Sequence, residues 1–293
     1  MQASAPPSPA PVPGTRSAVS IQGLWKHFGS QAAVAGLSLE LPAGAFIGLV
    51  GPNGAGKTTT LSMVTGLLRP DQGTVLVHGA DVWRDPVTVK ARIGILPEGL
   101  RMFERLSGRE LLQYNGRLRG LPGAEVDRRA EELLAVLDLA GDADKLVADY
   151  STGMRKKIGL AAALLHNPDV LFLDEPFEGV DPVSAQTIRG VLKRYAAAGS
   201  TVVFSSHVME LVEQLCDWVA VVNAGQVIAQ GPLDAVRGDR SLHEAFLSLI
   251  GVREDDGLAL GWLGTGRAGD APADDAPAGD GHPDGDRLGG EQR

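Results

Sequence analysis

The sequence is poor in several features, and each shortage excludes a class of protein. Its 293 residues include one cysteine, Cys216, so no disulfide can form within the chain, as is usual in a reducing cytoplasm. The longest apolar stretches, near Ile158–Leu165 and Trp218–Val222, are far shorter than the roughly 20 residues of a membrane-spanning helix. Met1–Pro13 has neither the basic start nor the apolar core expected of a signal peptide. The net charge of −9 argues against nucleic acid as a partner.

The composition changes at both ends of the chain. Residues 1–17 are rich in Pro and Ala. Residues 252–293 are mostly Gly, Asp, Ala and Pro, and their ten acidic residues against four arginines carry two thirds of the net charge. Both segments have too little apolar surface to fold alone, so we predict that both are disordered. Leu258–Leu263 is the apolar exception, either a docking segment or simply part of that tail. The sequence therefore predicts one folded region, at 18–251.

Hydrophobic periodicity predicts alternating strands and helices in this region. Strand-like runs are Val19–Leu24, Leu37–Leu41, Phe46–Val50, Gly73–Val77, Arg92–Leu96, Val170–Leu173, Thr201–Ser205, Trp218–Asn223 and Gln226–Gln230. Helices are expected at about 57–68, 107–119, 124–139, 151–166, 182–198, 207–215 and 241–249. The first half is rich in strands, and the stretch from about 100 to 166 is predicted to be all helix. This order indicates an α/β fold with a helical insert at about 99–167.

The segment Gly51–Thr59 is the most informative one, because it matches the phosphate-binding pattern G-x-x-x-x-G-K-[ST] without a mismatch. Its glycines let the backbone turn tightly and bring N–H groups onto phosphate oxygens. Lys57 supplies a positive charge to the β- and γ-phosphates, and the Thr58 hydroxyl can bind Mg²⁺. An apolar strand precedes the loop and a helix follows it, which makes the helix N-terminus an anion site. We therefore expect a nucleoside triphosphate here.

Two further strand ends carry polar groups. Val170–Leu173 runs into Asp174 and Glu175, and ligand crevices in parallel sheets lie at such carboxyl ends. Asp174 is suited to holding Mg²⁺ and Glu175 to activating the attacking water as a general base. The run that begins at Thr201 ends in Ser205, Ser206 and His207, and this histidine is placed to reach the γ-phosphate. The alternatives are a surface turn for the acidic pair and a packing role for the histidine.

Taken together, these motifs make residues 18–251 resemble the nucleotide-binding subunit of an ATP-binding cassette (ABC) transporter. Tyr150–Lys157 is similar to the signature segment of that family, usually L-S-G-G-Q, with Ser151 and Gly153 retained. The resemblance implies that these two residues bind the ATP held by an opposite subunit, across a dimer that encloses two ATP molecules. By itself, the segment would indicate only a helix cap.

The resemblance assigns the remaining site residues. It implies that the phosphates are bound by the loop residues Gly51, Asn53, Gly54, Gly56, Lys57, Thr58 and Thr59. Phe28 is the residue expected to stack on adenine, with Trp25 a weaker candidate and a core position the alternative. Asp181, in a segment that follows the carboxylate pair, is expected to communicate across the dimer. Pro182 is expected to begin the next helix.

One position departs from the family pattern. The family usually has Gln after the strand that precedes the helical insert, whereas this chain has Glu98. Its carboxylate can still offer oxygen to Mg²⁺, so the metal set implied by the resemblance is Thr58, Asp174 and Glu98. Glu98, together with Met in the signature segment, resembles the branch that exports drugs, lipids, polysaccharides or ions.

The resemblance implies a fold and a function. The expected fold is a P-loop NTPase core with a mixed sheet, an N-terminal antiparallel β subdomain and an inserted α-helical subdomain. The expected function is Mg²⁺-dependent ATP hydrolysis that powers export through a separate membrane permease, from the cytoplasmic face of the membrane. The dimer partner is a second copy or a paralogous ATPase subunit. The alternatives are a soluble ABC ATPase of DNA repair or translation, and a regulatory nucleotide-binding module. The sequence does not identify the cargo.

Overall fold

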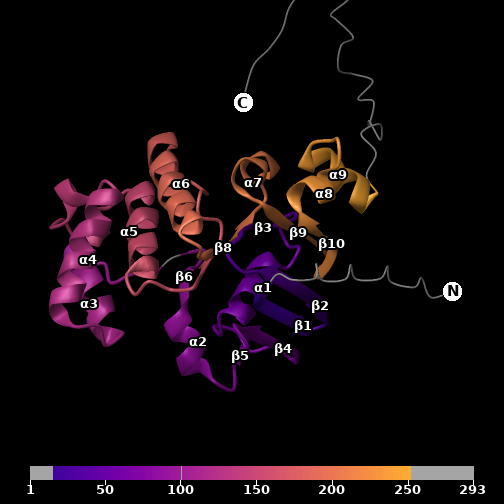
Figure 1. The fold of residues 1–293 in the computed structure, drawn as a ribbon, viewed down its shortest axis with the longest axis horizontal. Coiled ribbons are helices and arrows are strands. Elements are labelled where there is room, and N and C mark those ends of the chain that lie inside the picture. Colours follow the sequence, from indigo (N-terminus) through magenta and orange to yellow (C-terminus); the bar gives the residue numbers. More distant parts are fainter. Residues whose placement is uncertain (1–15, 100, 252–293) are drawn as a thin grey trace, which may run out of the picture. The chain divides into compact units, whose positions relative to one another are not determined.

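A six-stranded mixed sheet forms the centre of the fold in this computed structural model, which describes residues 16–99 and 101–251. Its strand order is β10-β9-β3-β8-β7-β6, and every neighbouring pair is parallel except β9 and β10 (Figure 1). The strands are β3 (Phe46–Val50), β6 (Ile93–Leu96), β7 (Val170–Leu173), β8 (Thr201–Ser206), β9 (Trp218–Asn223) and β10 (Gln226–Pro232). The carboxyl ends of β3, β6, β7 and β8 therefore lie along one edge.

A second sheet is entirely antiparallel, with the order β2-β1-β4-β5. It consists of β1 (Ser17–Phe28), β2 (Gln31–Pro42), β4 (Gln72–Val77) and β5 (Ala80–Asp81). Both β1 and β2 extend well beyond the predicted apolar runs, because their hairpin pairing continues through Trp25↔Ala35 to Phe28↔Gln31. The expected mixed sheet and antiparallel β part are therefore both present.

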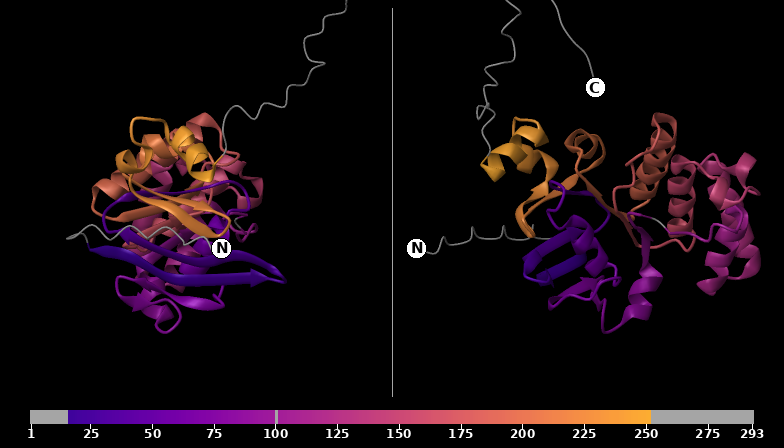
Figure 2. Two further views of the ribbon diagram at one scale, coloured as in Figure 1. Left: turned by 90° about the vertical axis from the view of Figure 1, so that its right-hand side faces the viewer. Right: turned by 180° about the vertical axis from the view of Figure 1, so that it is seen from behind.

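The central sheet is buried on both faces, as its uninterrupted apolar strands predict. Successive side chains of a strand point to opposite faces. In β3, Ile47 and Leu49 pack toward the antiparallel sheet and α1 (Lys57–Val64). Phe46 and Val50 belong to the core on the other face, which includes residues of α5 (Thr152–Leu164), α6 (Pro182–Ala197) and α7 (Met209–Leu215). The central sheet thus lies between two packed layers, the antiparallel sheet with α1 on one face and α5, α6 and α7 on the other (Figure 2).

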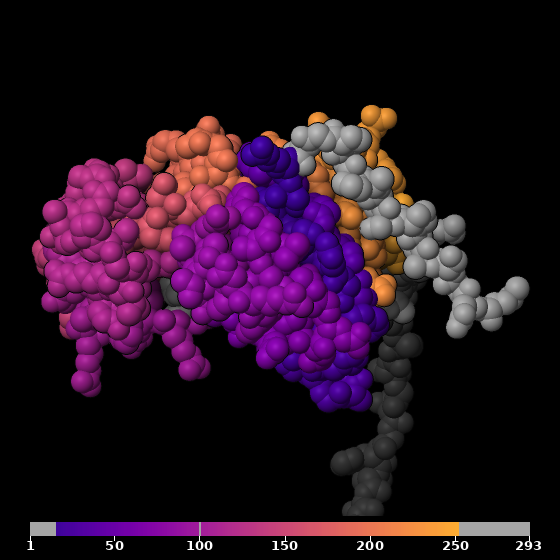
Figure 3. Space-filling model, turned by 60° about the horizontal axis from the view of Figure 1, so that its bottom comes forward, coloured from indigo at the N-terminus to yellow at the C-terminus, as the bar shows by residue number. Residues whose placement is uncertain are grey.

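The helical insert contains α3 (Gly108–Leu118), α4 (Gly123–Val136) and α5. It forms a lobe to one side of the β strands, coloured magenta in Figure 3. The inward face of α4 consists of Val126, Ala130 and Leu134, which are fully buried. As predicted, the regular elements in the described part of 100–166 are all helical. Two short 3-10 turns, Ala140–Asp142 and Val147–Asp149, connect α4 to α5.

Several predicted helix ends are too late, and local backbone conformations explain where the helices stop. The helix α1 ends at Val64, shortly before Gly66, which has a φ of 75°. The helix α5 ends at Leu164, shortly before Asn167 with a φ of 55°. Positive φ cannot continue a right-handed helix. Sequence patterns locate the ends of helices only to within a few residues.

Three further elements complete the described chain. The prediction missed two short helices, α2 (Pro86–Arg92) and α8 (Leu233–Arg237), whereas α9 (Leu242–Ile250) was expected. Asp85 caps α2 by accepting a hydrogen bond from the Thr88 N–H. Of the helices in the described ranges, none has the length and apolar character that crossing a membrane requires. The predicted disorder of 1–17 and 252–293, and the apolar segment Leu258–Leu263, fall almost wholly outside the described residues.

Candidate functional site

The phosphate loop connects the end of β3 to the start of α1, as predicted. Gly56 is the N-cap of α1 with a φ of 101°, and in the described residues no side chain caps this helix. A Cβ at Gly56 would lie 2.5 Å from the Ala33 carbonyl oxygen, so glycine is required for both conformation and space. The uncapped N–H groups and the positive end of the helix dipole therefore face the loop. This arrangement favours binding of an anion.

Lys57, the first residue of α1, folds back over the loop. Its Nζ donates hydrogen bonds to the Gly51 carbonyl at 2.8 Å and the Pro52 carbonyl at 3.2 Å. The same Nζ lies 3.8 Å from the Glu175 carboxylate, and the residue is only 6% exposed. The loop thus holds one positive charge close to a buried carboxylate.

Asp174 follows β7 and is tied to two neighbouring elements. Its Oδ1 accepts hydrogen bonds from the Thr58 hydroxyl at 3.2 Å and from the Ser205 hydroxyl at 2.5 Å. Burial raises the pKa of Asp174 above its ordinary value, while these two hydrogen bonds act in the opposite direction. The contacts fix one carboxylate oxygen beside the first turn of α1.

Glu175 lies next to His207, whose Nδ1 is 3.1 Å from the Glu175 Oε1. Burial raises the pKa of the Glu175 carboxyl, and the hydrogen bond and charge of His207 and the charge of Lys57 oppose that rise. A carboxylate with a raised pKa is better suited to accept a proton than an ordinary one. The structure thus brings together a candidate general base and a histidine that holds it.

Glu98 lies on the other side of Thr58, whose hydroxyl donates to the Glu98 Oε2 at 3.1 Å. Thr58, Asp174 and Glu98 therefore present oxygen atoms around one point. No group of three His, Cys, Asp or Glu side chains within the described ranges is placed to hold a metal by itself. Mg²⁺ prefers oxygen ligands and commonly binds one or two carboxylates together with substrate phosphates and water. The donor set fits Mg²⁺ delivered with a nucleotide.

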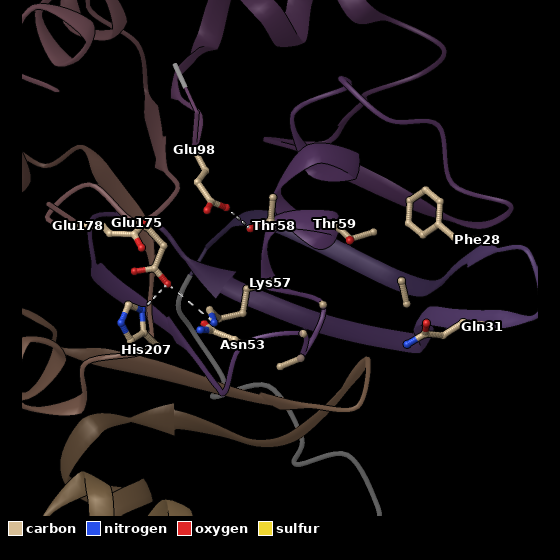
Figure 4. A pocket seen from close by; sticks show the side chains of 14 residues that line it. Phe28, Gln31, Asn53, Lys57, Thr58, Thr59, Glu98, Glu175, Glu178 and His207 are labelled. Carbon is tan, nitrogen blue, oxygen red and sulfur yellow. Dashed lines mark hydrogen bonds and ion pairs between the residues drawn. The ribbon is translucent and has the colours of Figure 1, made fainter. Parts of the chain in front are cut away.

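A cavity of about 430 Å³ joins these groups, within the usual range for small-molecule sites. Its lining consists of Phe28, Gln31, Ala33, Asn53, Gly54, Ala55, Gly56, Lys57, Thr58, Thr59, Glu98, Glu175, Glu178 and His207. Figure 4 shows Phe28 and Gln31 at one end and the Glu175–His207 pair at the other, with the phosphate loop between them. Phe28 is 55% exposed, so it is not a core residue. The predicted loop residues and strand ends therefore face one space, except for Gly51 and Asp174, which are buried and do not line it.

Some residues of the site were not predicted. Gln31 and Ala33 reach the cavity because the β1–β2 hairpin places Gln31 opposite Phe28. Glu178 lines the cavity from the segment after β7. Ser205 was noted only as a small polar residue at a strand end, yet it holds Asp174. A tight turn at Gly29–Ser30 is the sequence signal that could have found Gln31, since such a turn pairs the residues on either side of it.

The signature residues are not at this cavity. Ser151 is exposed and caps α5, its hydroxyl accepting a hydrogen bond from the Met154 N–H at 3.2 Å. Gly153 is buried, and a Cβ there would lie 2.6 Å from the Ser184 hydroxyl. Asp181 caps α6, accepting hydrogen bonds from the N–H groups of Val183 and Ser184. Neither Ser151, Gly153 nor Asp181 lines the cavity of its own chain.

Comparisons with known proteins agree with this architecture. The family model described as "ABC transporter" matches residues 34–178. A daunorubicin resistance ATP-binding protein of Streptomyces coeruleorubidus is 40% identical over 223 residues, which are 76% of this chain and 71% of the relative. The Nod factor export ATP-binding protein I of Ralstonia nicotianae is 37% identical over 249 residues, 85% of this chain and 76% of the relative.

A solved structure titled as the ATP-binding subunit of an ABC transporter superposes with a TM-score of 0.75 and 28% identity, covering 80% of this chain and all of that one. It shares the α/β fold, so the predicted fold class is confirmed. As predicted, the phosphate loop follows β3, the carboxylates follow β7 and the histidine follows β8. The chain therefore belongs to the ABC transporter family of ATP-binding proteins.

Proposed function

We propose that this chain binds and hydrolyses ATP as one subunit of an ABC transporter and powers export through a separate membrane subunit. The observation that carries the proposal is the grouping of Lys57, Glu175 and His207 at one end of the cavity, with separations of 3.8 Å from Lys57 Nζ to Glu175 Oε1 and 3.1 Å from His207 Nδ1 to Glu175 Oε1. A cationic loop next to a buried base is what hydrolysis of a triphosphate requires.

In this mechanism, the phosphates bind at the N-terminus of α1, and Lys57 leaves the Gly51 carbonyl to contact them. Thr58, Asp174 and Glu98 would hold Mg²⁺, which would supply positive charge to neutralise the phosphate oxygens. Glu175 accepts a proton from the attacking water, while His207 holds Glu175 and reaches the γ-phosphate. The protein's contribution is to position the reactants and to stabilise charge.

A second chain completes the site in this proposal. Ser151 is exposed at the start of α5, where the helix dipole is positive, and it does not line its own cavity. We infer that Ser151 and Gly153 contact the γ-phosphate bound by a second copy or a paralogue, with Asp181 between the two sites. The dimer then contains two ATP molecules.

Transport is favoured over a soluble ABC ATPase by the names of the relatives, one of which is an export protein and another a drug resistance protein. An exposed aromatic pair also supports a protein partner. Phe103, in the loop before α3, is 57% exposed, and Tyr114 on α3 is 44% exposed. Their rings meet edge to face with centroids 5.1 Å apart. We propose that the helical insert docks here on a permease at the cytoplasmic face of the membrane, with no role for nucleic acid.

The membrane partner can be tested with the full-length chain. We expect an affinity-tagged chain isolated from detergent-solubilised membranes of its source cells to bring down an integral membrane protein in stoichiometric amount. Phe103→Ala together with Tyr114→Ala should release that protein, because residues that act as interface hot spots contribute about 2 kcal/mol or more. Phe28→Ala, which removes an equally exposed aromatic at the nucleotide cavity, is the matched control and should retain it. A chain found wholly in the soluble fraction would exclude the transport role.

The adenine-stacking role of Phe28 gives a second prediction. Phe28→Ala should raise the dissociation constant for ATP by about 5- to 150-fold, since stacking of a base on an aromatic ring contributes roughly 1–3 kcal/mol. Phe28→Trp should retain the affinity, because any aromatic face can stack on a base. Phe103→Ala is the control of similar exposure. Isothermal titration calorimetry measures the binding, and unchanged affinity in Phe28→Ala would remove Phe28 from the site.

A further inference from the structure

The backbone of Glu175 has an unusual conformation for a residue with a side chain. Its φ is 44°, in the left-handed region, and Glu175 is one of five non-glycine residues with positive φ in the described part of the chain. Such conformations cost about 1–3 kcal/mol and persist only where the surroundings hold them. The direction of the Glu175 carboxylate therefore depends on what holds its peptide groups.

Two side chains from different elements hold these groups. The Glu175 N–H donates to the hydroxyl of Ser205, in β8, at 2.9 Å. The Glu175 carbonyl accepts a hydrogen bond from the Nζ of Lys156, in α5, at 2.8 Å. The Ser205 hydroxyl also donates a hydrogen bond to Asp174, and this contact already explains why a serine occupies the position. Lys156 has no role in the hydrolysis proposed above.

Partial burial of the Lys156 ammonium costs solvation free energy, which suggests that the residue has a function at this position. Burial lowers the pKa of Lys156, while the negative charges of Glu178, Asp174, Glu98 and Glu175 oppose that shift. A lysine elsewhere on the surface would keep its ammonium in water. Here the side chain is half-buried and its ammonium is bonded to the turn that carries the candidate base. A turn carbonyl that only needed a partner could bind water instead.

We propose that Lys156 is a positioning residue, which holds the Glu175 backbone in the conformation that directs the carboxylate toward His207. This inference rests on the role of Glu175 in the proposed function. Without the hydrogen bond, the peptide relaxes toward negative φ and the carboxylate leaves its place 3.1 Å from His207. Lys156 belongs to α5, the helix that Ser151 caps and that is proposed to contact a second chain. It therefore also connects that helix to Glu175, the candidate base of its own site.

Steady-state hydrolysis of Mg-ATP by the purified full-length chain tests the proposal. Lys156→Met should lower kcat by about ten- to a hundredfold, the usual effect of losing a hydrogen bond to a charged group. The KM for ATP should change by less than about twofold, because the nucleotide cavity is intact. Lys156→Arg should restore most of the rate, since a guanidinium can donate to the same carbonyl. Lys193→Met, which removes an exposed lysine of α6, should behave as the unmodified chain.

A double substitution separates positioning from a structural role. If Lys156 acts through Glu175, then Lys156→Met should cause no further loss in a Glu175→Gln background. Losses that multiply, or a normal kcat in Lys156→Met, would overturn the inference. Thermal unfolding verifies that the variants fold. If Lys156→Met does not fold, Lys156→Gln, which has a shorter side chain, replaces it. Normal turnover in Glu175→Gln alone would instead refute the proposed function.

Discussion

Replacing Glu175 with Gln is expected to slow ATP hydrolysis by about 10²- to 10⁴-fold, the usual contribution of a general base. Gln has nearly the same shape, so its amide oxygen can still lie 3.1 Å from the His207 Nδ1, but it cannot accept the proton of the attacking water. ATP binding should persist or strengthen, because the substitution removes a negative charge 3.8 Å from Lys57. The defect is therefore expected in kcat and not in affinity.

The same variant should accumulate as a dimer in the presence of Mg-ATP. If two chains close over two nucleotides and separate only after hydrolysis, a chain that binds but does not hydrolyse remains closed. Size-exclusion chromatography with and without ATP measures this. Glu132→Gln, on the exposed side of α4, removes the same charge from a surface ion pair and should change neither turnover nor assembly. Near-normal turnover in Glu175→Gln would exclude the role given to this carboxylate.

The convergence of the main site residues could be predicted from the sequence because it follows from topology. Lys57 follows β3 through the phosphate loop, while Glu175 and His207 lie within two residues of the ends of β7 and β8, strands of the same sheet. The parallel register pairs Val50 with Ser206 and Leu173 with Phe204, so the ends of β3, β7 and β8 lie side by side. Apolar runs that end in polar residues indicate such an edge without any knowledge of distances.

The contacts that orient these residues could not be predicted in the same way. Lys156 reaches Glu175 only because of the angle at which α5 packs in the core, and no local pattern encodes that angle. Ser205 is one of two adjacent serines in β8, and only the strand register determines which of them faces Asp174. The positions of Ser151 and Gly153 away from their own cavity fit the predicted second chain, which a single sequence can suggest only through resemblance.

Short and irregular segments were also beyond the sequence patterns. The helix α2 has seven residues and α8 has five, too few for a hydrophobic period to be visible. Between α4 and α5, the two 3-10 turns contain helix-compatible residues, and tertiary contacts decide their conformation. The Tyr150 hydroxyl donates to the Asp142 carbonyl at 2.8 Å, which ties this connection to the start of α5. Contacts from further along the chain, such as the hydrogen bond from the Val147 N–H to the Leu106 carbonyl at 2.9 Å, also override local propensity.

Replacing Lys57 with Ala is expected to weaken ATP binding by about ten- to a hundredfold or more. A hydrogen bond to a charged group contributes roughly 1.5–3 kcal/mol, and each 1.4 kcal/mol is a factor of ten in affinity. In the present structure Lys57 is only 6% exposed and its ammonium bonds to the Gly51 and Pro52 carbonyls, so it already lies within the loop. Phosphate oxygens with full negative charge are stronger acceptors than these neutral carbonyls. We therefore expect the ammonium to leave the carbonyls and bind the phosphate oxygens.

The affinity loss of Lys57→Ala should depend on the phosphates and not on the base. Calorimetric titrations with ATP and with AMP distinguish the two, because AMP lacks the β- and γ-phosphates that Lys57 contacts in the proposed complex. We expect a large loss for ATP and little change for AMP, whereas a defect in base stacking at Phe28 should weaken the binding of both nucleotides. Lys193→Ala, on the exposed side of α6, is the control for loss of a lysine. Unchanged ATP affinity in Lys57→Ala would contradict the assignment of Gly51–Thr59 as the phosphate site, and the proposed hydrolysis with it.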